Sequence, residues 1–421
     1  MISLYAQLCN DDTPMVKRAA ATHMAKFIKT LSKQHVLSEM IPLFNQIAVD
    51  DQDSVRLLAV EDLIAIAEML KPDDCKTHLS QTLKSLYEDK SWRVRYMIAE
   101  KFVQIAKTVG PEITKENLLS AFVKVLRDNE AEVKTAAATQ IPGFCALVSR
   151  DAILQHILPC VQELANDPSQ HVRASLATHV NGLAPLLGKE ETIAKLVPLF
   201  IQLLKDETSE VRLNVISKLD GVNKVIGVDK LSEYLLPAVV ELASDKQWRV
   251  RLAIIENIPL LAQQLGKAFF DDKFGNLCMT WLGDCVYSIR EAATNNLRKL
   301  VEVFGVDWAK QSILPKVIAM ANHSNYLYRI TTVFAIATIS QAVSPEVIRD
   351  LIVPTVKALS ADPIPNIRFN VAKAYESIIP LLKKGQMGGL LNDQIKPVLN
   401  KLGEDSDMDV RFFAQRALKV L

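Results

Sequence analysis

The sequence predicts an all-α protein: a right-handed superhelical solenoid, or α-α superhelix, built from antiparallel helix pairs. The first observation behind this prediction is a seven-residue phrase, DKSWRVR at 89–95, that returns as DKQWRVR at 245–251. The second is an apolar face with helical spacing that follows the phrase. The third is the scarcity of glycine, with 14 in 421 residues. This is about half the usual share of roughly 7%, and it argues against a turn-rich all-β fold.

The phrase belongs to an internal repeat with a fixed period. Its second basic residue serves as a marker, and successive markers lie 39 residues apart until the last interval of 43, which holds KKGQMGG at 383–389. A fixed period in this range indicates a stacked array. We interpret the three glycines of the long interval as a loop insertion rather than a phosphate-binding loop. The markers are Lys17, Arg56, Arg95, Lys134, Arg173, Arg212, Arg251, Arg290, Arg329, Arg368 and Arg411.

The period predicts one solenoid over residues 1–421, with no separate second domain. A unit of this length holds two helices and cannot bury its apolar face alone, so neighbouring units stack into a continuous core. We expect approximate repeats at 1–38 (incomplete), 39–77, 78–116, 117–155, 156–194, 195–233, 234–272, 273–311, 312–350, 351–393 and 394–421.

The second helix of each unit is expected to begin near four residues before the marker. Side chains that can accept hydrogen bonds from a helix start stand there in many units, and Pro14 follows the first of them at a position that suits the first turn. An apolar face then runs through Val55, Ala59, Leu63 and Ile66, with one polar residue, Asp62, within it. The expected capping residues are Thr13, Ser91, Ser169, Thr208, Asn325 and Asp407.

Glycine and proline predict where the helices end and bend. Fifteen residues after the marker stand glycines that can adopt the positive φ found where helices end: Gly110, Gly188, Gly227, Gly266 and Gly305. Fourteen residues before the marker, prolines recur inside an apolar stretch that we interpret as the first helix of the unit, kinked by the proline. These prolines are Pro42, Pro159, Pro198, Pro237, Pro315, Pro354 and Pro397.

An aspartate six residues before the marker forms a second column beside the basic one. The two columns flank the short turn between the helices of each unit, so the stack predicts helix capping and an inter-repeat ladder of opposite charges. His323 takes the place of the aspartate in one unit. The aspartates are Asp11, Asp50, Asp89, Asp128, Asp167, Asp206, Asp245, Asp284, Asp362 and Asp405.

The composition and the scattered reactive residues argue against several function classes. Lys+Arg 49 against Asp+Glu 48 leaves a net charge of +1, so no global field attracts nucleic acid or an anionic membrane. No apolar run is long enough for membrane insertion. The six cysteines form no CxxC pair and are typical of reduced thiols in an intracellular protein. The histidines form no metal or catalytic pattern, so we expect no enzyme activity, no catalytic residue, no metal and no cofactor.

Four aromatic residues share a place three residues before the marker, at the mouth of the second helix: Trp92, Trp248, Tyr287 and Tyr326. Packing against a neighbouring turn is one interpretation. The other is protein binding, because an aromatic side chain followed by arginine has the composition of an interface anchor. Both stay open on the sequence pattern alone.

The unit pattern, with proline in the first helix and D-x-x-x-x-V-R leading into the second, resembles HEAT repeats. Strings along the whole chain, in order, resemble the scaffolding A subunits of protein phosphatase 2A. Among them are CNDDTPMVKRAAA, EDKSWRVRYMIAEKF, WRVRLAIIENIPLLAQQLG and YSIREAATNNL. A HEAT-repeat adaptor of another class, for nuclear transport or tubulin binding, is the alternative.

The resemblance implies a non-catalytic scaffold that assembles a serine/threonine phosphatase by its intra-repeat turns, in the cytoplasm and with a nuclear location left open. Turns of the later repeats would hold the catalytic subunit, through Trp248, Arg249, Val286, Tyr287, Tyr326, Arg329, Pro365 and Asn366. Turns of the earlier repeats would hold variable regulatory B-type subunits, through Pro14, Lys17, Arg18, Ser91, Trp92 and Arg93.

Two departures from the family pattern bear on the regulatory side. By the family's order the first unit here corresponds to the fifth, so the first repeats of the family are expected to be lacking. Lys17 stands where the family carries arginine, and lysine keeps the charge but loses the bidentate fork of a guanidinium.

Overall fold

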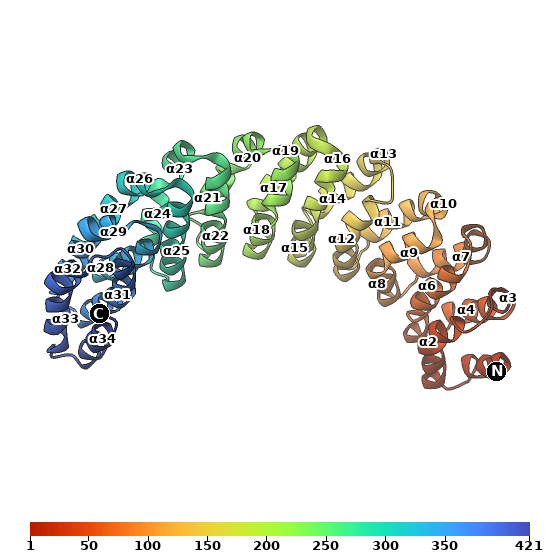
Figure 1. The fold of residues 1–421 in the computed structure, drawn as a ribbon. Helices are drawn as coiled ribbons and strands as arrows, with labels where there is room; N and C mark the ends of the chain where they lie inside the picture. Colours follow the sequence, from red (N-terminus) through yellow and green to blue (C-terminus); the bar gives the residue numbers. More distant parts are fainter. The chain divides into compact units, whose positions relative to one another are not determined.

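The computed structural model describes the backbone of residues 1–421 and the side chains of all residues except 264 and 265. Helices and short turns make up the described chain, and the all-α solenoid architecture predicted from the sequence is confirmed. The chain divides into two compact units, Met1–Leu235 and Leu236–Leu421. Within each unit, Figure 1 shows helices paired and stacked side by side.

The first unit contains the following elements, of which those labelled η are π-helical or 3₁₀ turns. They are α1 (Ile2–Cys9), α2 (Pro14–Ile28), α3 (Lys33–His35), η1 (Val36–Met40), α4 (Ile41–Ala48), α5 (Asp53–Arg56), α6 (Ala59–Met69), α7 (Pro72–Tyr87), α8 (Trp92–Glu100), α9 (Phe102–Val109), α10 (Pro111–Ile113), η2 (Thr114–Leu118), α11 (Leu119–Leu126), α12 (Ala131–Cys145), α13 (Arg150–Ala152), η3 (Ile153–Ile157), α14 (Leu158–Leu164), α15 (Gln170–His179), η4 (Val180–Leu183), α16 (Ala184–Glu191), η5 (Thr192–Leu196), α17 (Val197–Leu204), α18 (Ser209–Ile216), α19 (Leu219–Ile226) and α20 (Val228–Tyr234).

The second unit has the same alternation of interrupted first helices and longer second helices. Its elements are α21 (Leu236–Leu242), α22 (Trp248–Leu265), α23 (Lys267–Lys273), α24 (Gly275–Leu282), α25 (Tyr287–Phe304), α26 (Val306–Trp308), η6 (Ala309–Ile313), α27 (Leu314–Ala319), η7 (Met320–Asn322), α28 (Tyr326–Ile339), η8 (Ser340–Ala342), α29 (Pro345–Val347), η9 (Ile348–Ile352), α30 (Val353–Leu359), α31 (Pro365–Lys384), α32 (Gly388–Leu390), η10 (Leu391–Ile395), α33 (Lys396–Gly403) and α34 (Met408–Lys419).

The prolines interrupt the first helices as predicted, and the interruption has a specific form. A five-residue π-helical turn comes directly before the α-helix that carries Pro42 near its start, and the same order recurs at Pro159 and Pro354. Proline has no N–H to donate, so the preceding turn widens and shifts its hydrogen bonds. The π turn η2 precedes Leu119–Leu126, which has no proline at its start, so stacking of the units also favours this geometry.

The capping prediction was wrong for most second helices. Thr13, Ser91, Ser169 and Thr208 make no side-chain hydrogen bond to their helix starts, whereas Asn325 and Asp407 do. The aspartate two residues earlier accepts the backbone N–H of this position instead, as Asp89 Oδ1 does from Ser91 at 2.8 Å. Because that carboxylate already turns the chain, the hydroxyl is free to bond elsewhere, and Ser91 Oγ donates to Asp53 at 2.9 Å.

The marker side chains and the aspartates form the predicted ladder. Arg56 Nε and Nη2 donate to the two carboxylate oxygens of Asp89 in the next repeat at 2.7 and 2.8 Å, and its Nη1 donates to the carbonyls of Asp50 and Asp51 at 2.8 and 3.0 Å. Arg56 therefore ties its own turn to the next one. The hydrogen bond from Arg368 lowers the pKa of Asp405, so that pair stays ionised at neutral pH. The pairs are Lys17–Asp50, Arg56–Asp89, Arg95–Asp128, Lys134–Asp167 and Arg173–Asp206 in the first unit, and Arg251–Asp284, Arg329–Asp362 and Arg368–Asp405 in the second.

Buried aromatic and aliphatic side chains fill the space between the stacked pairs. In the first unit, Phe102, Phe122 and Phe144 pack with ring centroids 4.4 to 5.2 Å apart. In the second unit Trp281 and Trp308 are fully buried, and their indole N–H groups donate to Ala243 O and Asp271 Oδ1, both at 2.9 Å. The core of each unit is thus continuous through its repeats, as stacking requires.

The five glycines that follow the second helices have the positive φ that the sequence predicted. At Gly110, φ is 94° and ψ is 168°, a region open to glycine alone. A Cβ there would also lie 3.3 Å from Pro72.

We expect Gly110→Ala to lower the free energy of unfolding of the flanking repeats by about 1 to 3 kcal/mol, because the backbone must leave this region or carry its strain. Hydrogen exchange of α9 and α10 measures the effect. The matched control is Gly388→Ala, where no atom lies within 4 Å of the new Cβ and φ is not positive. Equal behaviour of the two variants would show that the backbone at Gly110 is not strained by a side chain.

Candidate protein-interaction surface

The ladder holds the turns between paired helices in a row, and the candidate interaction surface lies along this row in each unit. The tryptophans show the contrast between core and surface. Trp281 and Trp308 are buried in the second unit, whereas Trp92 at the start of α8 is 41% exposed and Trp248 at the start of α22 is partly exposed. Aromatic side chains placed at a surface in register with a repeat are available to a partner.

In the second unit, the pair at the start of α22 is organised by its own contact. The guanidinium of Arg249 lies over the ring of Trp248, 4.6 Å from its centroid, and Arg249 is exposed. A cation–π contact of this kind limits the rotamers of both side chains. Val250, the next residue, is fully buried. The same helical turn therefore exposes Trp248 and Arg249 to solvent and packs Val250 into the core.

The remaining residues predicted to face a catalytic subunit fall into three groups. Tyr287 and Tyr326 begin α25 and α28 and are 57% and 43% exposed, and exposed Asn366 is near the start of α31. Arg329 instead belongs to the ladder, since its Nε and Nη2 donate to Asp362 at 2.7 and 3.2 Å. Partly exposed Val286 and Pro365 complete the set, as N-cap of α25 and first residue of α31.

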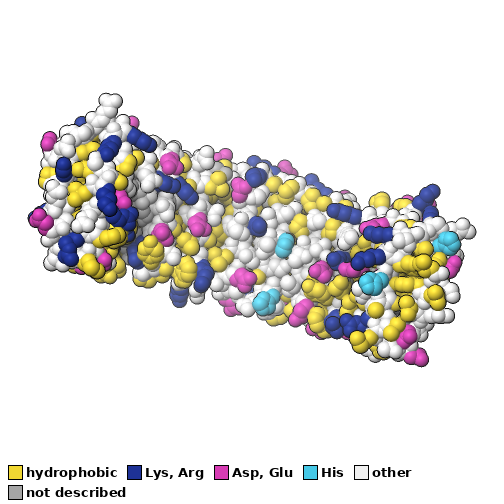
Figure 2. Space-filling view, turned by 60° about the horizontal axis from the view of Figure 1, so that its bottom comes forward, with side chains coloured by type: hydrophobic (Ala, Val, Ile, Leu, Met, Phe, Trp, Pro, Cys, Tyr) yellow, Lys and Arg dark blue, Asp and Glu magenta, His cyan; other side chains and the backbone are white. Residues whose placement is uncertain are grey.

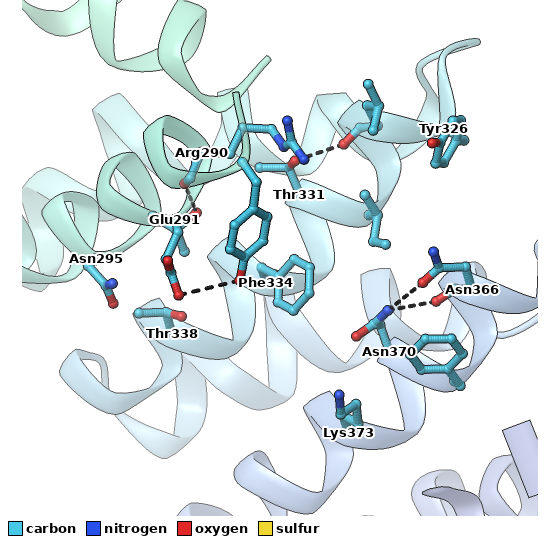
Figure 3. A pocket seen from close by; sticks show the side chains of 15 residues that line it. Arg290, Glu291, Asn295, Tyr326, Thr331, Phe334, Thr338, Asn366, Asn370 and Lys373 are labelled. Atoms are coloured by element: carbon cyan, nitrogen blue, oxygen red, sulfur yellow. Dashed lines mark hydrogen bonds between the residues drawn. The ribbon is translucent and has the colours of Figure 1, made fainter. Parts of the chain in front are cut away.

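Tyr287, Tyr326 and Asn366 come together in one groove, shown in Figure 3. The groove has a volume of about 560 Å³ and lies between α25, α28 and α31. Trp248, Arg249 and Arg329 do not line it. The other lining residues are Arg290, Glu291, Thr294, Asn295, Leu327, Ile330, Thr331, Phe334, Thr338, Phe369, Asn370 and Lys373.

Sequence reasoning missed the part of this groove that lies on the bodies of the second helices. Asn295, Phe334 and Lys373 each stand five residues after a marker, and all three line the groove. Residues at one position of the repeat share one face of the stack. The 39-residue spacing could therefore have identified these three residues, but only the turns between helices were considered in the prediction.

In the first unit, the residues predicted to face a regulatory subunit lie at two turns. Pro14 and Arg18 are exposed on α2, whereas Lys17 pairs with Asp50 at 2.8 Å in the ladder. Trp92 lies edge-on to Tyr96 with ring centroids 6.4 Å apart.

At the second of these turns the polar neighbours of Trp92 share one carboxylate. Ser91 Oγ donates to Asp53 at 2.9 Å, and Arg93 Nη1 lies 3.8 Å from the same carboxylate. The exposed atoms of this turn are therefore an aromatic ring flanked by a guanidinium, the same chemistry as at Trp248 and Arg249.

Metal-binding groups of side chains and helices that could span a membrane are both absent among the described residues. No group of three or more His, Cys, Asp or Glu side chains among these residues could hold a metal ion. None of the described helices combines the length and apolar character needed to cross a bilayer. The cysteines are free thiols, buried except for Cys285, which is exposed at the turn before α25.

Comparison with known proteins bears on the same repeats. The PPP2R1A-like HEAT repeat family matches residues 111–188 and 189–266. Over 77 residues the chain is 56% identical to the regulatory A subunit of protein phosphatase PP2A from Schizosaccharomyces pombe, a stretch covering 18% of this chain and 13% of that protein. The chain is a PP2A A-subunit-like HEAT-repeat protein.

Further relatives agree with this assignment. The A-subunit-like chain is 40% identical over 125 residues to the PP2A regulatory A subunit of Saccharomyces cerevisiae, a stretch that covers 29% of this chain and 20% of that protein. It is 52% identical over 58 residues to the beta isoform of the 65 kDa regulatory A subunit of Homo sapiens phosphatase 2A, or 14% of this chain and 9% of that protein. Each matched stretch is thus less than a quarter of the relative's length.

Solved structures of other helical solenoids show the fold. A crystal structure of importin beta matches all of this chain and 55% of its own length, with a TM-score of 0.61 and 14% identity. One of Kap121p matches with a TM-score of 0.60 and 14% identity, over 45% of its length. At this identity the likeness concerns the helical solenoid alone.

Proposed function

We propose that this chain is a non-catalytic scaffold that binds the regulatory subunits as well as the catalytic subunit of a 2A-type serine/threonine phosphatase through its intra-repeat turns. The observation that carries the proposal is the presence of exposed aromatic and arginine pairs on turns of a chain whose relatives are named as PP2A regulatory A subunits. In this proposal the chain assembles the phosphatase and does not itself hydrolyse phosphoesters. The proposal also places the chain in the cytoplasm, with the nucleus as a second location.

The two units supply two separate surfaces for this purpose. Trp248, Arg249, Tyr287 and Tyr326 of the second unit would bind the catalytic subunit. Arg18, Trp92 and Arg93 of the first unit would bind regulatory subunits. Trp, Tyr and Arg are the side chains that contribute most to protein interfaces when they become fully desolvated, and each of these is accessible in the free chain.

The ladder explains why a scaffold can expose such side chains without losing its fold. The guanidinium groups that stabilise the stack are those of the markers, such as Arg251, which donates to Asp284 at 3.0 and 3.1 Å. Arg249 is two residues earlier and is exposed. The stabilising arginine and the proposed binding arginine are therefore different residues of one turn, and they can be tested apart.

We expect the double substitution Trp248→Ala and Arg249→Ala to weaken binding of the PP2A catalytic subunit by about 30- to 1,000-fold. This corresponds to 2 to 4 kcal/mol for a pair of anchor residues. Helicity and melting should change little, because both side chains lie at the surface. Binding is measured by titrating the chain with purified catalytic subunit.

The matched control is Trp92→Ala with Arg93→Ala, the same pair of residue types in the first unit. This variant should bind the catalytic subunit like the unchanged chain and should bind a regulatory subunit more weakly. Equal loss of catalytic-subunit binding in both double variants would refute the division into two surfaces. Co-purification of the unchanged chain with transport cargo or tubulin, and with no phosphatase subunit, would favour another class of HEAT adaptor.

A further inference from the structure

The ladder of the second unit has a gap at Arg290. In the repeats before and after it, the Nε and Nη2 atoms of Arg251 and Arg329 each donate to an aspartate of the next repeat. The next repeat after Arg290 carries His323 at this place. Arg290 Nη1 still donates to the carbonyls of Asp284 and Cys285, at 2.8 and 3.1 Å. No carboxylate among the described residues lies within ion-pair distance of its other nitrogens.

His323 replaces the aspartate in one of its two functions only. Its Nδ1 accepts the backbone N–H of Asn325 at 3.0 Å, as the aspartates do in the other turns. Its ring stacks on Tyr328, with centroids 4.1 Å apart. The turn is therefore preserved, but the ring offers no carboxylate to Arg290. One edge of a guanidinium, which elsewhere in the stack receives a bidentate partner, is left without one.

Arg290 lines the groove between α25, α28 and α31. Figure 3 shows its side chain reaching toward Thr331 at one edge of the groove, with Lys373 at the opposite edge. Lys373 has no carboxylate partner among the described residues, and its ammonium lies over the rings of Phe369 and Phe413, at 5.6 and 4.6 Å. The acidic side chain of the groove, Glu291, accepts a hydrogen bond from the hydroxyl of Tyr287 at 3.3 Å.

The space between the two cations is lined by exposed aromatic side chains. Tyr287, Tyr326 and Phe334, from α25 and α28, are all at least 40% exposed. The guanidinium carbon of Arg290 lies 5.7 Å from the centroid of the Tyr287 ring. Figure 2 shows hydrophobic side chains next to Lys and Arg side chains at the left, over the second unit. Large apolar side chains that stay in water in a groove mark a surface that a partner can cover.

We propose that this groove binds an acidic peptide segment of a partner protein. The carboxylate of its Asp or Glu pairs with Arg290, in the place that an aspartate of the chain itself takes at the neighbouring repeats. An apolar side chain of the same segment packs among Tyr287, Tyr326 and Phe334. Lys373 attracts a second acidic group. A volume of about 560 Å³ lies within the range of about 300 to 1,000 Å³ of sites that enclose small ligands.

The charge pattern favours a carboxylate peptide over other occupants. The stack repeatedly places a carboxylate on this edge of the marker guanidinium, so the local geometry suits a planar, bidentate acceptor. Two cations face a single carboxylate that already has a hydrogen-bond donor, so the groove attracts negative charge. The groove shares Tyr287 and Tyr326 with the surface proposed for the catalytic subunit, but peptide binding is tested on the chain alone and so can fail or succeed independently of phosphatase assembly.

The test uses the full chain and an array of immobilised octapeptides. Each peptide carries one Asp or Glu and one Leu or Phe at varied separations, and a matched set carries Asn or Gln instead. The best acidic peptide is then measured in solution by fluorescence anisotropy. We expect its amide counterpart to bind at least about tenfold more weakly, because the amide cannot form a hydrogen-bonded charge pair with Arg290.

Two substitutions of His323, which lies outside the groove lining, distinguish pairing of the peptide carboxylate with Arg290 from nonspecific binding. His323→Asp supplies the missing carboxylate from within the chain and should weaken binding at least about tenfold, while leaving melting unchanged or raised. His323→Asn keeps the acceptor for Asn325 without a charge and should bind like the unchanged chain. Equal binding by His323→Asp and the unchanged chain would overturn the proposal. So would equal binding of acidic and amide peptides, or binding confined to phosphoserine peptides included in the array.

Discussion

Val250→Asp is expected to unfold the repeats around α22. Val250 is completely buried and directly precedes the ladder residue Arg251, whose guanidinium is already paired with Asp284. The new carboxylate would enter an apolar core with no cation to receive it. A buried charge without a partner costs about 3 to 5 kcal/mol, which is a large part of the stability of a few helical pairs.

The loss should be local, because each repeat contacts only its neighbours. Hydrogen exchange should show lost protection in α22 and α25, with the distant helices α2 to α9 retaining theirs. The matched control is Arg249→Asp, which places the same carboxylate one residue earlier at an exposed position. It should change the free energy of unfolding by less than about 1 kcal/mol. Similar losses of stability in both variants would mean that position 250 is no more buried than position 249.

Features that depend on single residues at fixed intervals could be predicted from the sequence. The 39-residue spacing of the markers placed Arg56 opposite Asp89 and Arg368 in the same column, and both pair as predicted. Gly110 was predicted to have positive φ, and it does. In both cases one backbone or charge requirement recurs at the same position of several repeats, so the sequence shows it more than once.

Features that depend on competition between neighbouring groups could not be predicted in this way. Ser91 and Thr208 are good capping residues in isolation, yet Asp89 and Asp206 accept the N–H groups of these turns first. The groove was also missed. It exists only when α25, α28 and α31 are adjacent, and its unpaired arginine results from the single exception, His323, in the aspartate column.

Asp62 was noted only as a polar interruption of an apolar face, and its consequence required the structure. Its side chain is 1% exposed in α6, and its Oδ2 has no hydrogen-bond partner among the described residues. Burial raises the pKa of its carboxyl to about 8, which a backbone hydrogen bond from Ala25 opposes and the Glu61 carboxylate increases. Tyr5 and Cys9 of α1 are the other titratable groups nearby.

This pKa sets the sign of a pH dependence. An aspartate in an unfolded chain has a pKa of about 3.9, so between about pH 4 and pH 8 the unfolded chain has lost a proton that folded Asp62 keeps. Below about pH 4, the ionisation of Asp62 therefore does not change the free energy of unfolding. As the pH rises toward 8 it lowers the free energy of unfolding increasingly, and above pH 8 this lowering stays constant. Stability of the first repeats should fall across this window.

Asp62→Asn is expected to remove this dependence, because the amide has no charge at any pH. The variant should be more stable than the unchanged chain by on the order of 4 kcal/mol at pH 8, after about 1 kcal/mol for an unpaired amide donor. At pH 5 the two should be nearly equal. Hydrogen exchange of α2 and α6, compared between the two proteins at each pH, measures the difference. Glu61→Gln, at the exposed preceding residue, should keep most of the pH dependence, because Glu61 raises the pKa of Asp62 less than burial does. A difference between the Asp62→Asn variant and the unchanged chain that stays constant from pH 5 to pH 8 would show that Asp62 is ionised in the folded state throughout.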